Sequence, residues 1–376
     1  MSCGKGSDVA VLVSYSGDGG VERMMNALIA GLLGAGFRVD VLVLGQRGGH
    51  FAEIPADARV VPLRPGHAAL AGPALVRYLR RERPPVLLAA KDRAGRAALR
   101  ARARAGVATR VVLRIGNTLS QSLAGRGALR RWLRYRPIRR WYPHADCIVA
   151  VSRGVAEDVV ATSGVDPARV TVIHNPVVGP DLDRMAAPTP DHPWFGTGQP
   201  PVLLAVGRLT RQKDFATLLR AFARLRSGTV ARLIVLGEGE ERAALERLAR
   251  ELGVDGAVDF PGFVDNPYAW MGAADLFVLS SAWEGSPNAL TEALYLGVPL
   301  VATDCRSGPR EILDGGRVAP LVPVGDAAAL AEAMSATLAA PPPADRLRAA
   351  ATGYTHERSI ADYLEVLGLS NRTDPC

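Results

Sequence analysis

The sequence predicts an α/β protein made of two Rossmann-like domains. Short apolar runs that are typical of buried strands alternate with helical segments along most of the chain, which predicts parallel sheets covered by helices on both faces. The length of 376 residues is too great for one ordinary domain and suits two of roughly 150–200 residues each. A proline-rich stretch between 176 and 200 separates the two series of strands, so we expect the domain boundary there.

The composition narrows the class of protein. Hydrophobic residues make up 48% of the chain, enough for a substantial core in each domain. No apolar run reaches the roughly 18–20 residues that span a bilayer, and the polar start MSCGKGSD does not resemble a signal peptide, so we expect a cytoplasmic protein. The cysteines lack metal-site or CxxC spacing and are expected to be reduced: Cys3, Cys147, Cys305 and Cys376.

The chain is strongly basic, with a net charge of +8 and a sequence pI of about 9.7. This favours an anionic partner, and nucleotide phosphates, an anionic membrane and nucleic acid are all candidates. Among the 45 basic residues only Lys5, Lys91 and Lys213 are lysines. Because arginine stands almost everywhere else, we expect a remaining lysine to be needed as a compact charge.

The first domain begins with a strand at 8–14, a glycine-rich turn at 16–20 (SGDGG) and a helix from about Val21. Gly19 and Gly20 would let the backbone approach a ligand closely, and the helix start offers unpaired amides, although a plain tight turn explains the pattern equally well. Further strands are expected at 38–44, 59–62, 86–90, 110–114 and 147–151. A helix is expected at 74–82, and a second one follows the strand at 86–90 and ends at about 104.

Polar residues follow two of these strands. Lys91 and Asp92 follow the strand at 86–90. Arg114 ends the strand at 110–114, and Gly116 and Asn117 follow it. Ligands gather at the carboxyl ends of parallel strands, so these residues are candidates for a substrate site, and structural ion pairing is an equal alternative.

Residues 126–142 (RGALRRWLRYRPIRRWY) contain seven arginines, four aromatic residues and no acid. This composition suits an anionic membrane surface, and it also suits nucleic acid or a solvated basic face. Pro137 is expected to interrupt any long helix here. We favour peripheral membrane contact.

The stretch 179–199 is rich in proline and without periodicity, which predicts an interdomain linker. Asp181-Leu182-Asp183 within it matches a metal-binding DxD pattern superficially. We reject a metal site there, because the pair lies in a linker and nothing nearby completes a metal shell.

The second domain opens with a strand at 201–206, a loop, and a helix from about Ala216 to Leu225. Arg208 and Lys213 lie five residues apart in that loop. The arginine fork and the compact lysine charge can together clamp two phosphates. Strand and helix then alternate again, at 232–236, 241–252 and 258–260.

The stretch 275–304 predicts a strand, a helix and a second strand. Leu276–Leu279 is a short apolar run, Ser286 is expected as N-cap and Pro287 as the first residue of a helix to about Leu296, and Gly297 should end that helix. The unpaired amides of its first turn could hold a phosphate, namely those of Asn288, Ala289 and Leu290.

Two glutamates flank this helix start. Glu292, over a turn further in, could accept hydrogen bonds from ribose hydroxyls, and Glu284, in the loop before the helix, could face the other end of the same ligand. Together they predict a site for a nucleotide-diphosphate sugar. The alternative is that both are solvated charges on an amphipathic helix.

The segment EGSPNALTEALYLGVPLVAT resembles the paired-glutamate signature of family-4 retaining glycosyltransferases of the GT-B fold. Other segments agree in order, including the GGxER form at 19–23. The resemblance implies two Rossmann-like domains facing each other across a cleft, with a C-terminal helix crossing back to the first domain. The implied parts are an acceptor domain at 1–178 with a helix at about 355–370, a linker at 179–199 and a donor domain at 200–354.

The resemblance further implies transfer of a sugar from a nucleotide-diphosphate sugar, a UDP-sugar being favoured, to a hydroxyl of a glycan or lipid-linked glycan in bacterial lipopolysaccharide or exopolysaccharide synthesis. A front-face mechanism with retention needs no metal, no other cofactor and no strong protein base. Accordingly His144 and His174 are expected to be structural. The implied location is the cytoplasm, peripheral to the inner face of the cytoplasmic membrane.

The same resemblance assigns roles to individual residues. Backbone groups around Phe263 and Val264 would recognise the base. The implied catalytic residues are Glu284, Arg208 and Lys213; the donor-binding residues are Gly19, Gly20, Arg208, Lys213, Phe263, Val264, Glu284, Ser286, Asn288, Ala289, Leu290 and Glu292; the acceptor-binding residues are Lys91, Arg114 and Asn117.

Other functions are weighed against this one. A soluble small-molecule acceptor is the first alternative, and a nucleotide-sugar epimerase of the same fold is the second. A Rossmann oxidoreductase would need a fuller GxGxxG unit than residues 16–20 provide. A nucleic-acid-binding module would rest on charge alone, so we expect no nucleic-acid partner.

Overall fold

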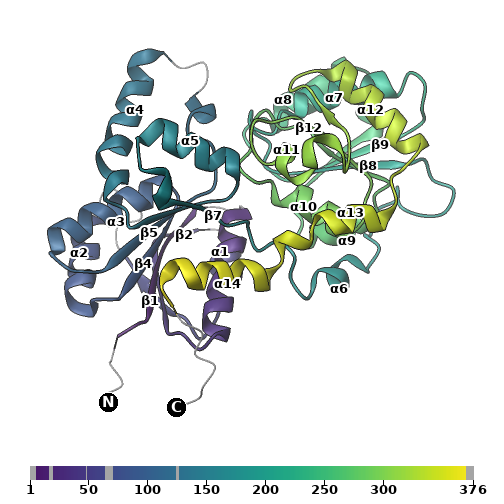
Figure 1. Ribbon diagram of the computed structural model, residues 1–376. Coiled ribbons are helices and arrows are strands. Elements are labelled where there is room, and N and C mark those ends of the chain that lie inside the picture. Colours follow the sequence, from purple (N-terminus) through teal and green to yellow (C-terminus); the bar gives the residue numbers. More distant parts are fainter. Residues whose placement is uncertain (1–5, 17–19, 48, 64–70, 124–126, 370–376) are drawn as a thin grey trace. The chain divides into compact units, whose positions relative to one another are not determined.

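The computed structural model describes residues 6–16, 20–47, 49–63, 71–123 and 127–369. The chain divides into two compact units, Met1–Pro176 together with His356–Cys376, and Val177–Thr355 (Figure 1). Each unit is a parallel sheet covered by helices on both faces, so the expectation of two Rossmann-like domains is confirmed.

The sheet of the first unit has the strand order β3-β2-β1-β4-β5-β6-β7, with all neighbours parallel. The order reverses between β1 and β4, which is the switch point of a doubly wound sheet. The strands are β1 (Val9–Ser16), β2 (Val39–Arg47), β3 (Arg59–Pro62), β4 (Val86–Ala90), β5 (Arg110–Ile115), β6 (Cys147–Ala150) and β7 (Val170–Val172).

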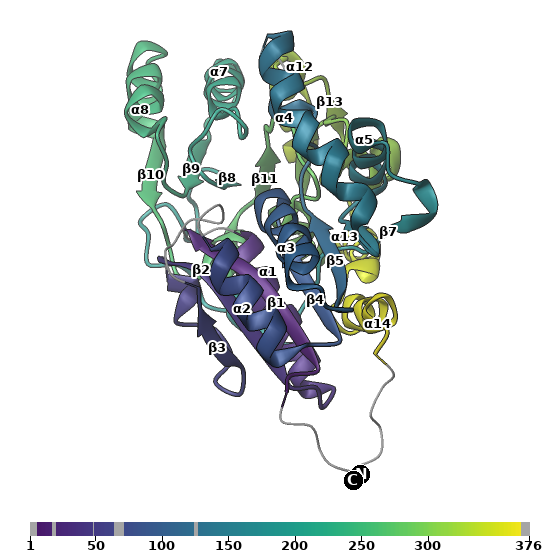
Figure 2. The same cartoon turned by 90° about the vertical axis from the view of Figure 1, so that its left-hand side faces the viewer.

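Helices cover both faces of this sheet because its central strands β1 and β4 present buried apolar side chains on both sides. In β1, Ala10 and Leu12 pack with α2, α3, α4 and α5, whereas Val9, Val11 and Val13 pack with α1 and α14. Figure 2 shows α2, α3 and α4 side by side on one face. The helices are α1 (Gly20–Gly34), α2 (Gly72–Glu82), α3 (Asp92–Ala105), α4 (Ala128–Trp141), α5 (Arg153–Ser163) and α14 (His356–Leu367), and single 3₁₀ turns lie at Gly49–Phe51, Gln121–Leu123, Tyr142–His144 and Pro167–Arg169.

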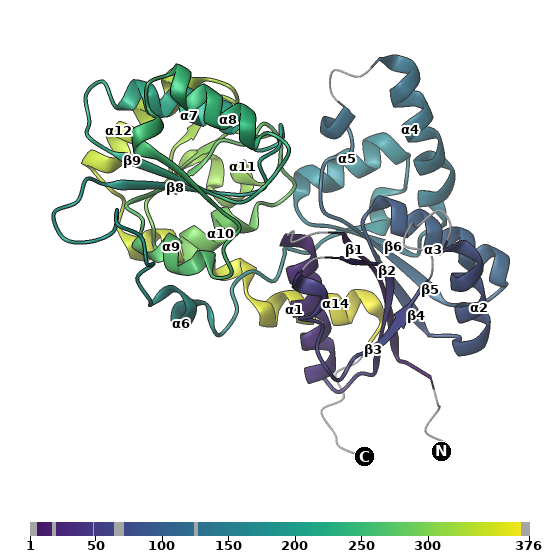
Figure 3. The same cartoon turned by 180° about the vertical axis from the view of Figure 1, so that it is seen from behind.

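The sheet of the second unit has the order β10-β9-β8-β11-β12-β13, again parallel throughout, with its switch point between β8 and β11. Figure 3 shows β8 and β9 between α7 and α8 on one side and α9 and α10 on the other. The strands are β8 (Val202–Val206), β9 (Arg232–Leu236), β10 (Val258–Gly262), β11 (Leu276–Leu279), β12 (Leu300–Thr303) and β13 (Leu321–Val322). The helices are α6 (Leu182–Ala186), α7 (Phe215–Leu225), α8 (Arg242–Glu251), α9 (Pro267–Ala273), α10 (Asn288–Tyr295), α11 (Pro309–Ile312), α12 (Ala327–Ala339) and α13 (Ala344–Ala350), and 3₁₀ turns lie at Asp255–Ala257, Asp314–Gly316 and Thr352–Tyr354.

The C-terminal helix α14 belongs to the first unit, as predicted. It packs on α1 where Gly31 leaves room for Ile360, since a Cβ at Gly31 would lie 2.1 Å from Ile360 Cδ1. The Ser359 hydroxyl donates to the carbonyl oxygen of His174 over 2.9 Å. The return of the chain is therefore fixed by close packing as well as by a hydrogen bond.

The segment 179–199 is not the free linker that its prolines predicted. It belongs to the second unit, where α6 packs on α9 and the Asn266 side chain donates to the Met185 carbonyl over 2.7 Å. Leu182 is buried, and the rings of His192, Phe195 and Trp270 pack together. A few apolar side chains thus pack this segment onto the second unit, although its composition favours an extended chain.

The expectation that Pro137 breaks the basic segment is wrong, because α4 runs through it from Ala128 to Trp141. The proline removes one hydrogen bond, to the carbonyl of Leu133, and Leu133 lies on the exposed side of the helix where water can replace that bond. Tyr135 and Ile138 anchor the other side in the core.

Asp92 joins α3 to α4. Its carboxylate, at the first residue of α3, accepts two hydrogen bonds of 2.8 Å from Arg96 and lies 2.9 Å from Arg134 Nη2 of α4. The Tyr142 hydroxyl, just after α4, donates to it over 3.2 Å. Burial alone would favour the neutral acid, but the bonds and charges of Arg96, with the charge of Arg134, lower the pKa of Asp92 below its ordinary value.

We predict that Asp92→Asn lowers the free energy of unfolding by about 3 kcal/mol near pH 7, because Arg96 is left buried without its partner. A lowered folded-state pKa means that the stabilisation is present above the ordinary aspartate pKa and is lost as the pH falls through the folded-state value. The difference from wild type should therefore shrink below about pH 4. Urea unfolding at several pH values measures it. The exposed Asp345→Asn is the control, and an equal effect there would contradict the account.

Candidate active site

The loop after β8 carries Arg208 and is held by the loop after β9. Two backbone amides of this loop donate across, Gly207 to Leu236 O and Leu209 to Glu238 O, each over 2.9 Å. The approach requires glycine, because a Cβ at Gly239 would lie 2.2 Å from Leu209 O. The backbone that positions Arg208 is thus rigidly supported. Arg208 itself is exposed, and among the described residues no carboxylate pairs with it.

Lys213 and Glu284 form an ion pair across the switch point of the second sheet. Lys213 ends the loop after β8, Glu284 lies in the loop after β11, and Lys213 Nζ is 2.6 Å from Glu284 Oε1. Both side chains are largely buried, and the Ser281 hydroxyl donates to the same carboxylate oxygen over 2.8 Å. Two charges from distant parts of the sequence therefore meet at the point where an open α/β sheet binds its ligands.

Further bonds tie the two loops together. The Ser280 hydroxyl donates to the Lys213 carbonyl over 2.8 Å, and the amide of Ala282 donates to the Gln212 carbonyl over 2.8 Å. The Gln212 side chain donates to the Trp283 carbonyl over 3.0 Å. Sequence reasoning did not single out these supporting groups, because serines and a glutamine beside charged residues give no distinctive local pattern.

The loop after β12 packs beneath the Glu284 loop. The Ser307 hydroxyl donates to the Gly285 carbonyl over 3.0 Å, and a Cβ at Gly308 would lie 2.7 Å from Pro287 Cδ. The Cys305 thiol donates to the Ser281 carbonyl over 3.0 Å, and burial raises its pKa to about 12, so it stays a neutral structural thiol. Among the described residues the free cysteines are Cys147 and Cys305, and both are buried.

Helix α10 starts one residue later than predicted. Its N-cap is Pro287 and not Ser286, and no side chain caps it. Pro287 has φ of −74° and ψ of 106°, an extended conformation, so it precedes the helix and is not its first residue. The end is as predicted, because Gly297 has φ of 74° and donates to the Leu294 carbonyl.

The predicted set of phosphate-binding amides is narrower than expected. The Leu290 amide donates to the Pro287 carbonyl over 3.1 Å, so this amide is already used within the turn. Asn288 and Ala289 are the first two residues of the helix, where the macrodipole is positive.

Both glutamates are buried, so the alternative of solvated surface charges is wrong. Glu284 is 6% exposed and Glu292 is 3% exposed. The Tyr268 hydroxyl of α9 donates to Glu292 Oε1 over 3.4 Å. Carboxylates are rarely buried unless they are ion-paired or hydrogen-bonded. Burial therefore distinguishes these two glutamates from solvent-exposed acids.

Phe263 lies immediately after β10 with 53% of its surface exposed. It follows Gly262, whose φ is 89° and whose carbonyl accepts from the Gly237 amide over 2.7 Å. Val264 is partly buried beside it. An aromatic face at the carboxyl end of a strand could hold a base, and that assignment stays a prediction.

In the first unit, Lys91 forms a similar pair with Glu22. Its Nζ lies 2.7 Å from Glu22 Oε1, and Glu22 lies in the first turn of α1 and is buried. Lys91 follows β4 and has φ of 73°, a left-handed value that a lysine adopts only under constraint. Gly20 begins α1, whereas Gly19 lies outside the described residues. Sequence reasoning missed Glu22, although it stands in the GGxER segment.

The other two acceptor candidates lie differently. Arg114 is fully buried beside Tyr363 of α14, and its Nη2 donates to Asn175 Oδ1 over 2.6 Å. This environment favours a structural role, in which Arg114 links β5 to the returning helix. Asn117 is partly exposed and its Oδ1 accepts from the Thr118 amide over 2.9 Å. The acceptor assignments of Lys91 and Asn117 stay predictions.

In the DxD segment, Asp181 is the N-cap of α6 and Asp183 lies in its first turn. Asp183 accepts a hydrogen bond of 2.7 Å from the Tyr295 hydroxyl, and Asp181 pairs with Arg184. Within the described ranges, no three His, Cys, Asp or Glu side chains are grouped so that they could hold a metal ion. Over the same ranges, every helix is too short or too polar to cross a membrane.

Two family models match the chain, one in each unit. Residues 18–178 match the model described as Glycosyltransferase Family 4, and residues 200–340 match the model described as Glycosyl transferases group 1.

Named relatives and solved structures agree with this match. The lipopolysaccharide core biosynthesis glycosyltransferase LpsE of Rhizobium meliloti is 29% identical over 86% of this chain and 87% of its own length. The N-acetylgalactosamine-N,N'-diacetylbacillosaminyl-diphospho-undecaprenol 4-alpha-N-acetylgalactosaminyltransferase of Campylobacter jejuni is 34% identical over 49% of this chain, and the match spans about half (48%) of that protein. The structure of HepE of Anabaena in complex with UDP and glucose superimposes with a TM-score of 0.77 and 20% identity, over 96% of this chain and 99% of that one.

We predict that Lys213 and Glu284 are energetically coupled by about 2 kcal/mol, because each is left buried and unpaired when the other is removed. The measurement is a double-mutant cycle of urea unfolding with Lys213→Met, Glu284→Gln and the double variant. The exposed pair Arg184 and Asp181 is the control, and its coupling should be close to zero. Additive effects at Lys213 and Glu284 would contradict the ion pair.

Proposed function

This chain belongs to the glycosyltransferases of the GT-B fold, with the family-4 domain in its first half and the group 1 domain in its second, and from this premise we propose its donor and its reaction. The donor is a nucleotide-diphosphate sugar, with a UDP-sugar favoured. It binds at the carboxyl ends of β8 and β11. The observation that carries the proposal is the pair of buried glutamates, Glu284 and Glu292, on either side of an uncapped helix start and next to Lys213.

The positive groups around this point suit a diphosphate. Arg208 and Lys213 approach from the loop after β8, and the amides of Asn288 and Ala289 lie at the start of α10. The Lys213 ammonium has three N–H groups, so it can donate to a phosphate while it stays bonded to Glu284. Glu292, a turn further along, is placed to accept hydrogen bonds from ribose hydroxyls, and Glu284 from sugar hydroxyls.

The reaction retains the configuration at the anomeric carbon. The bond between that carbon and the diphosphate oxygen breaks, the acceptor hydroxyl oxygen bonds to the same face, and its proton passes to the departing diphosphate. Arg208, Lys213 and the helix amides stabilise the charge that develops on the leaving group. These groups supply the positive charge that a divalent metal supplies in other transferases, so the proposed reaction needs no metal and no other cofactor.

The acceptor is a glycan or lipid-linked glycan of a bacterial cell surface, in lipopolysaccharide or exopolysaccharide synthesis. Two relatives support this acceptor class. An enzyme of lipopolysaccharide core biosynthesis is similar to 86% of this chain, and an enzyme whose acceptor is carried on diphospho-undecaprenol is similar to 49% of it. Such acceptors lie at a membrane, which requires the enzyme to approach one.

Helix α4 suits that approach. It carries six arginines and no acid, and Leu129, Trp132 and Leu133 are each more than half exposed. The Arg136 guanidinium carbon lies 5.3 Å from the centroid of the Trp132 ring, so a cation and an aromatic ring are presented together. We place this helix at the headgroup level of the anionic inner face of the cytoplasmic membrane, as a peripheral contact.

A thermal-shift panel tests the donor. UDP-, GDP- and ADP-sugars are added in EDTA, and one nucleotide class should stabilise the protein, by about 2.7 kcal/mol at a concentration near 100 times its Kd. Glu292→Gln and Lys213→Ala should abolish the shift, whereas Glu332→Gln, an exposed glutamate of α12, should not. No shift with any nucleotide sugar would overturn the donor assignment, and a shift that requires Mg²⁺ would overturn metal independence.

Sedimentation with vesicles of phosphatidylglycerol and phosphatidylcholine tests α4. Trp132→Ala and Leu133→Ala should each weaken vesicle binding about tenfold, because an apolar side chain no longer enters the interface. Val230→Ala removes an exposed apolar residue of the second unit and should change nothing. Equal binding by all three variants would contradict the membrane role of α4.

A further inference from the structure

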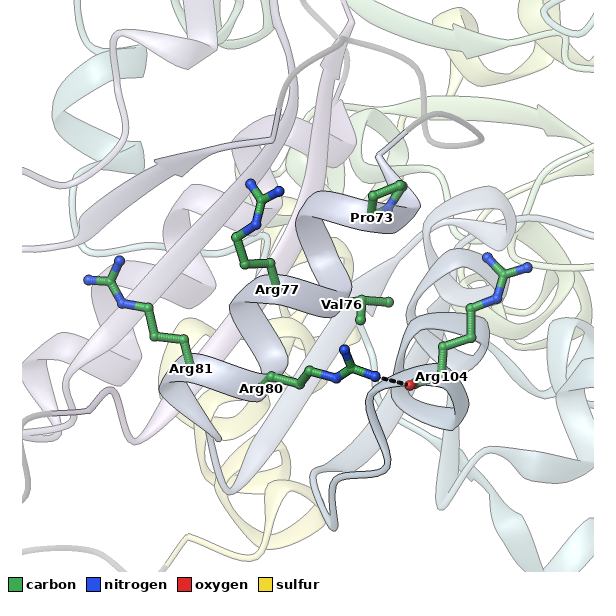
Figure 4. Close-up of a pocket in the computed structure, with 6 residues that line it drawn as sticks. All are labelled: Pro73, Val76, Arg77, Arg80, Arg81 and Arg104. Atoms are coloured by element: carbon green, nitrogen blue, oxygen red, sulfur yellow. Dashed lines mark hydrogen bonds between the residues drawn. The ribbon is translucent and has the colours of Figure 1, made fainter.

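A second concentration of positive charge lies in the first unit, in a hollow between α2 and α3. Its volume is about 690 Å³, and it is lined by Pro73, Val76, Arg77, Arg80, Arg81 and Arg104. Figure 4 shows Val76 in the middle, with Arg77 on one side and Arg104 on the other. A hollow of this size can accept a small ligand, and its lining offers four guanidinium groups and no carboxylate.

The fold accounts for only part of this arrangement. Arg80 donates to the carbonyl oxygens of Arg104 over 2.9 Å and of Ala105 over 3.4 Å, so it caps the end of α3. Arg81 lies 3.2 Å from Glu82. Arg77 and Arg104, in contrast, pair with no carboxylate in the described part of the chain.

Like charges face each other along α2, because Arg77 is three residues from Arg80 and four from Arg81. Arg80 has the carbonyl oxygens at the end of α3 as partners, and Arg81 has Glu82, so both are compensated. Arg77 has no such partner among the described residues, and a bound anion would reduce the repulsion at its position.

The charge of the surrounding layer strengthens the argument. Helices α2, α3 and α4 together carry fourteen arginines against one aspartate and one glutamate, a net of +12. The whole chain has a net charge of +8, so the rest of the protein is negative by 4. Arg100 lies on α3 with Arg96 and Arg104. Burial lowers the pKa of Arg100, and the charges of Arg96 and Arg104 lower it further. The layer is thus a positive field that concentrates anions at the hollow.

We propose that this hollow is a phosphate-binding site, separate from the donor site, in which Arg77 and Arg104 bind phosphate oxygens. The guanidinium fork matches phosphate and keeps its charge at every physiological pH. The ligand is a phosphate ester or diphosphate, carried either by a soluble compound or by a lipid headgroup. The site lies in the first unit and does not depend on the donor assignment in the second.

Isothermal titration with inorganic pyrophosphate tests the site. The variant Arg77→Gln/Arg104→Gln should bind one pyrophosphate fewer than wild type, or bind it roughly tenfold more weakly for each arginine removed. The control Arg83→Gln/Arg93→Gln removes the same charge from exposed positions just after α2 and at the start of α3, outside the hollow and outside α4, and should keep the site. If pyrophosphate also binds at the donor site, that second site remains in both variants, so the number lost is diagnostic whichever assignment is right.

Anionic vesicles then identify the source of the phosphate. If it is a lipid headgroup, the hollow variant should lose about fivefold in vesicle affinity per arginine beyond the loss of the control. If both variants bind vesicles equally while only the hollow variant loses pyrophosphate, the ligand is a soluble phosphorylated compound. The proposal is overturned if the hollow variant binds both probes as the control does, since the effect would then be the general field of the layer.

Discussion

The ion pair between Lys213 and Glu284 is the interaction on which the proposed site depends. It joins the loops that follow β8 and β11, neighbouring strands whose sequences lie about seventy residues apart. Because both charges are largely buried, either one alone would be costly, and the pair therefore fixes the two loops relative to each other. The close approach of Gly239 to Leu209 and the packing of Gly308 on Pro287 hold those loops from either side.

The first unit repeats this device with the charges exchanged. There the glutamate, Glu22, follows β1 and the lysine, Lys91, follows β4, and the two meet at 2.7 Å across the corresponding switch point. Two of the three lysines of the chain thus stand at the switch points, while arginine serves almost everywhere else. A compact ammonium fits between two strand ends where a guanidinium fork would need more room. The left-handed backbone of Lys91 is the strain that this placement requires.

The sequence predicted what depends on local pattern. Buried parallel strands are continuous apolar runs, so 86–90 and 232–236 were placed to the residue. The exposed edge strand 59–62 was also placed to the residue. Contacts between segments that are far apart in the chain could not be predicted from the sequence. The burial of Arg114 against Tyr363, the partner of Lys91 and the attachment of the proline-rich 179–199 all depend on tertiary packing. Helix α4 passes Pro137 for the same reason, and α5, β7, α9, α12 and α13 were not predicted, since their apolar faces have meaning only against the sheets. Gly19 and the turn before it lie outside the described residues.

Hydrogen–deuterium exchange with and without a UDP-sugar tests the central claim most directly, because it reports on individual loops. The account predicts slower exchange at the amides of 207–214 and of 285–292, the two loops that the Lys213–Glu284 pair joins, and little change in α8 and α12 of the same unit. Slower exchange confined to other segments, or none while the ligand is bound, would contradict the placement of the donor at this switch point.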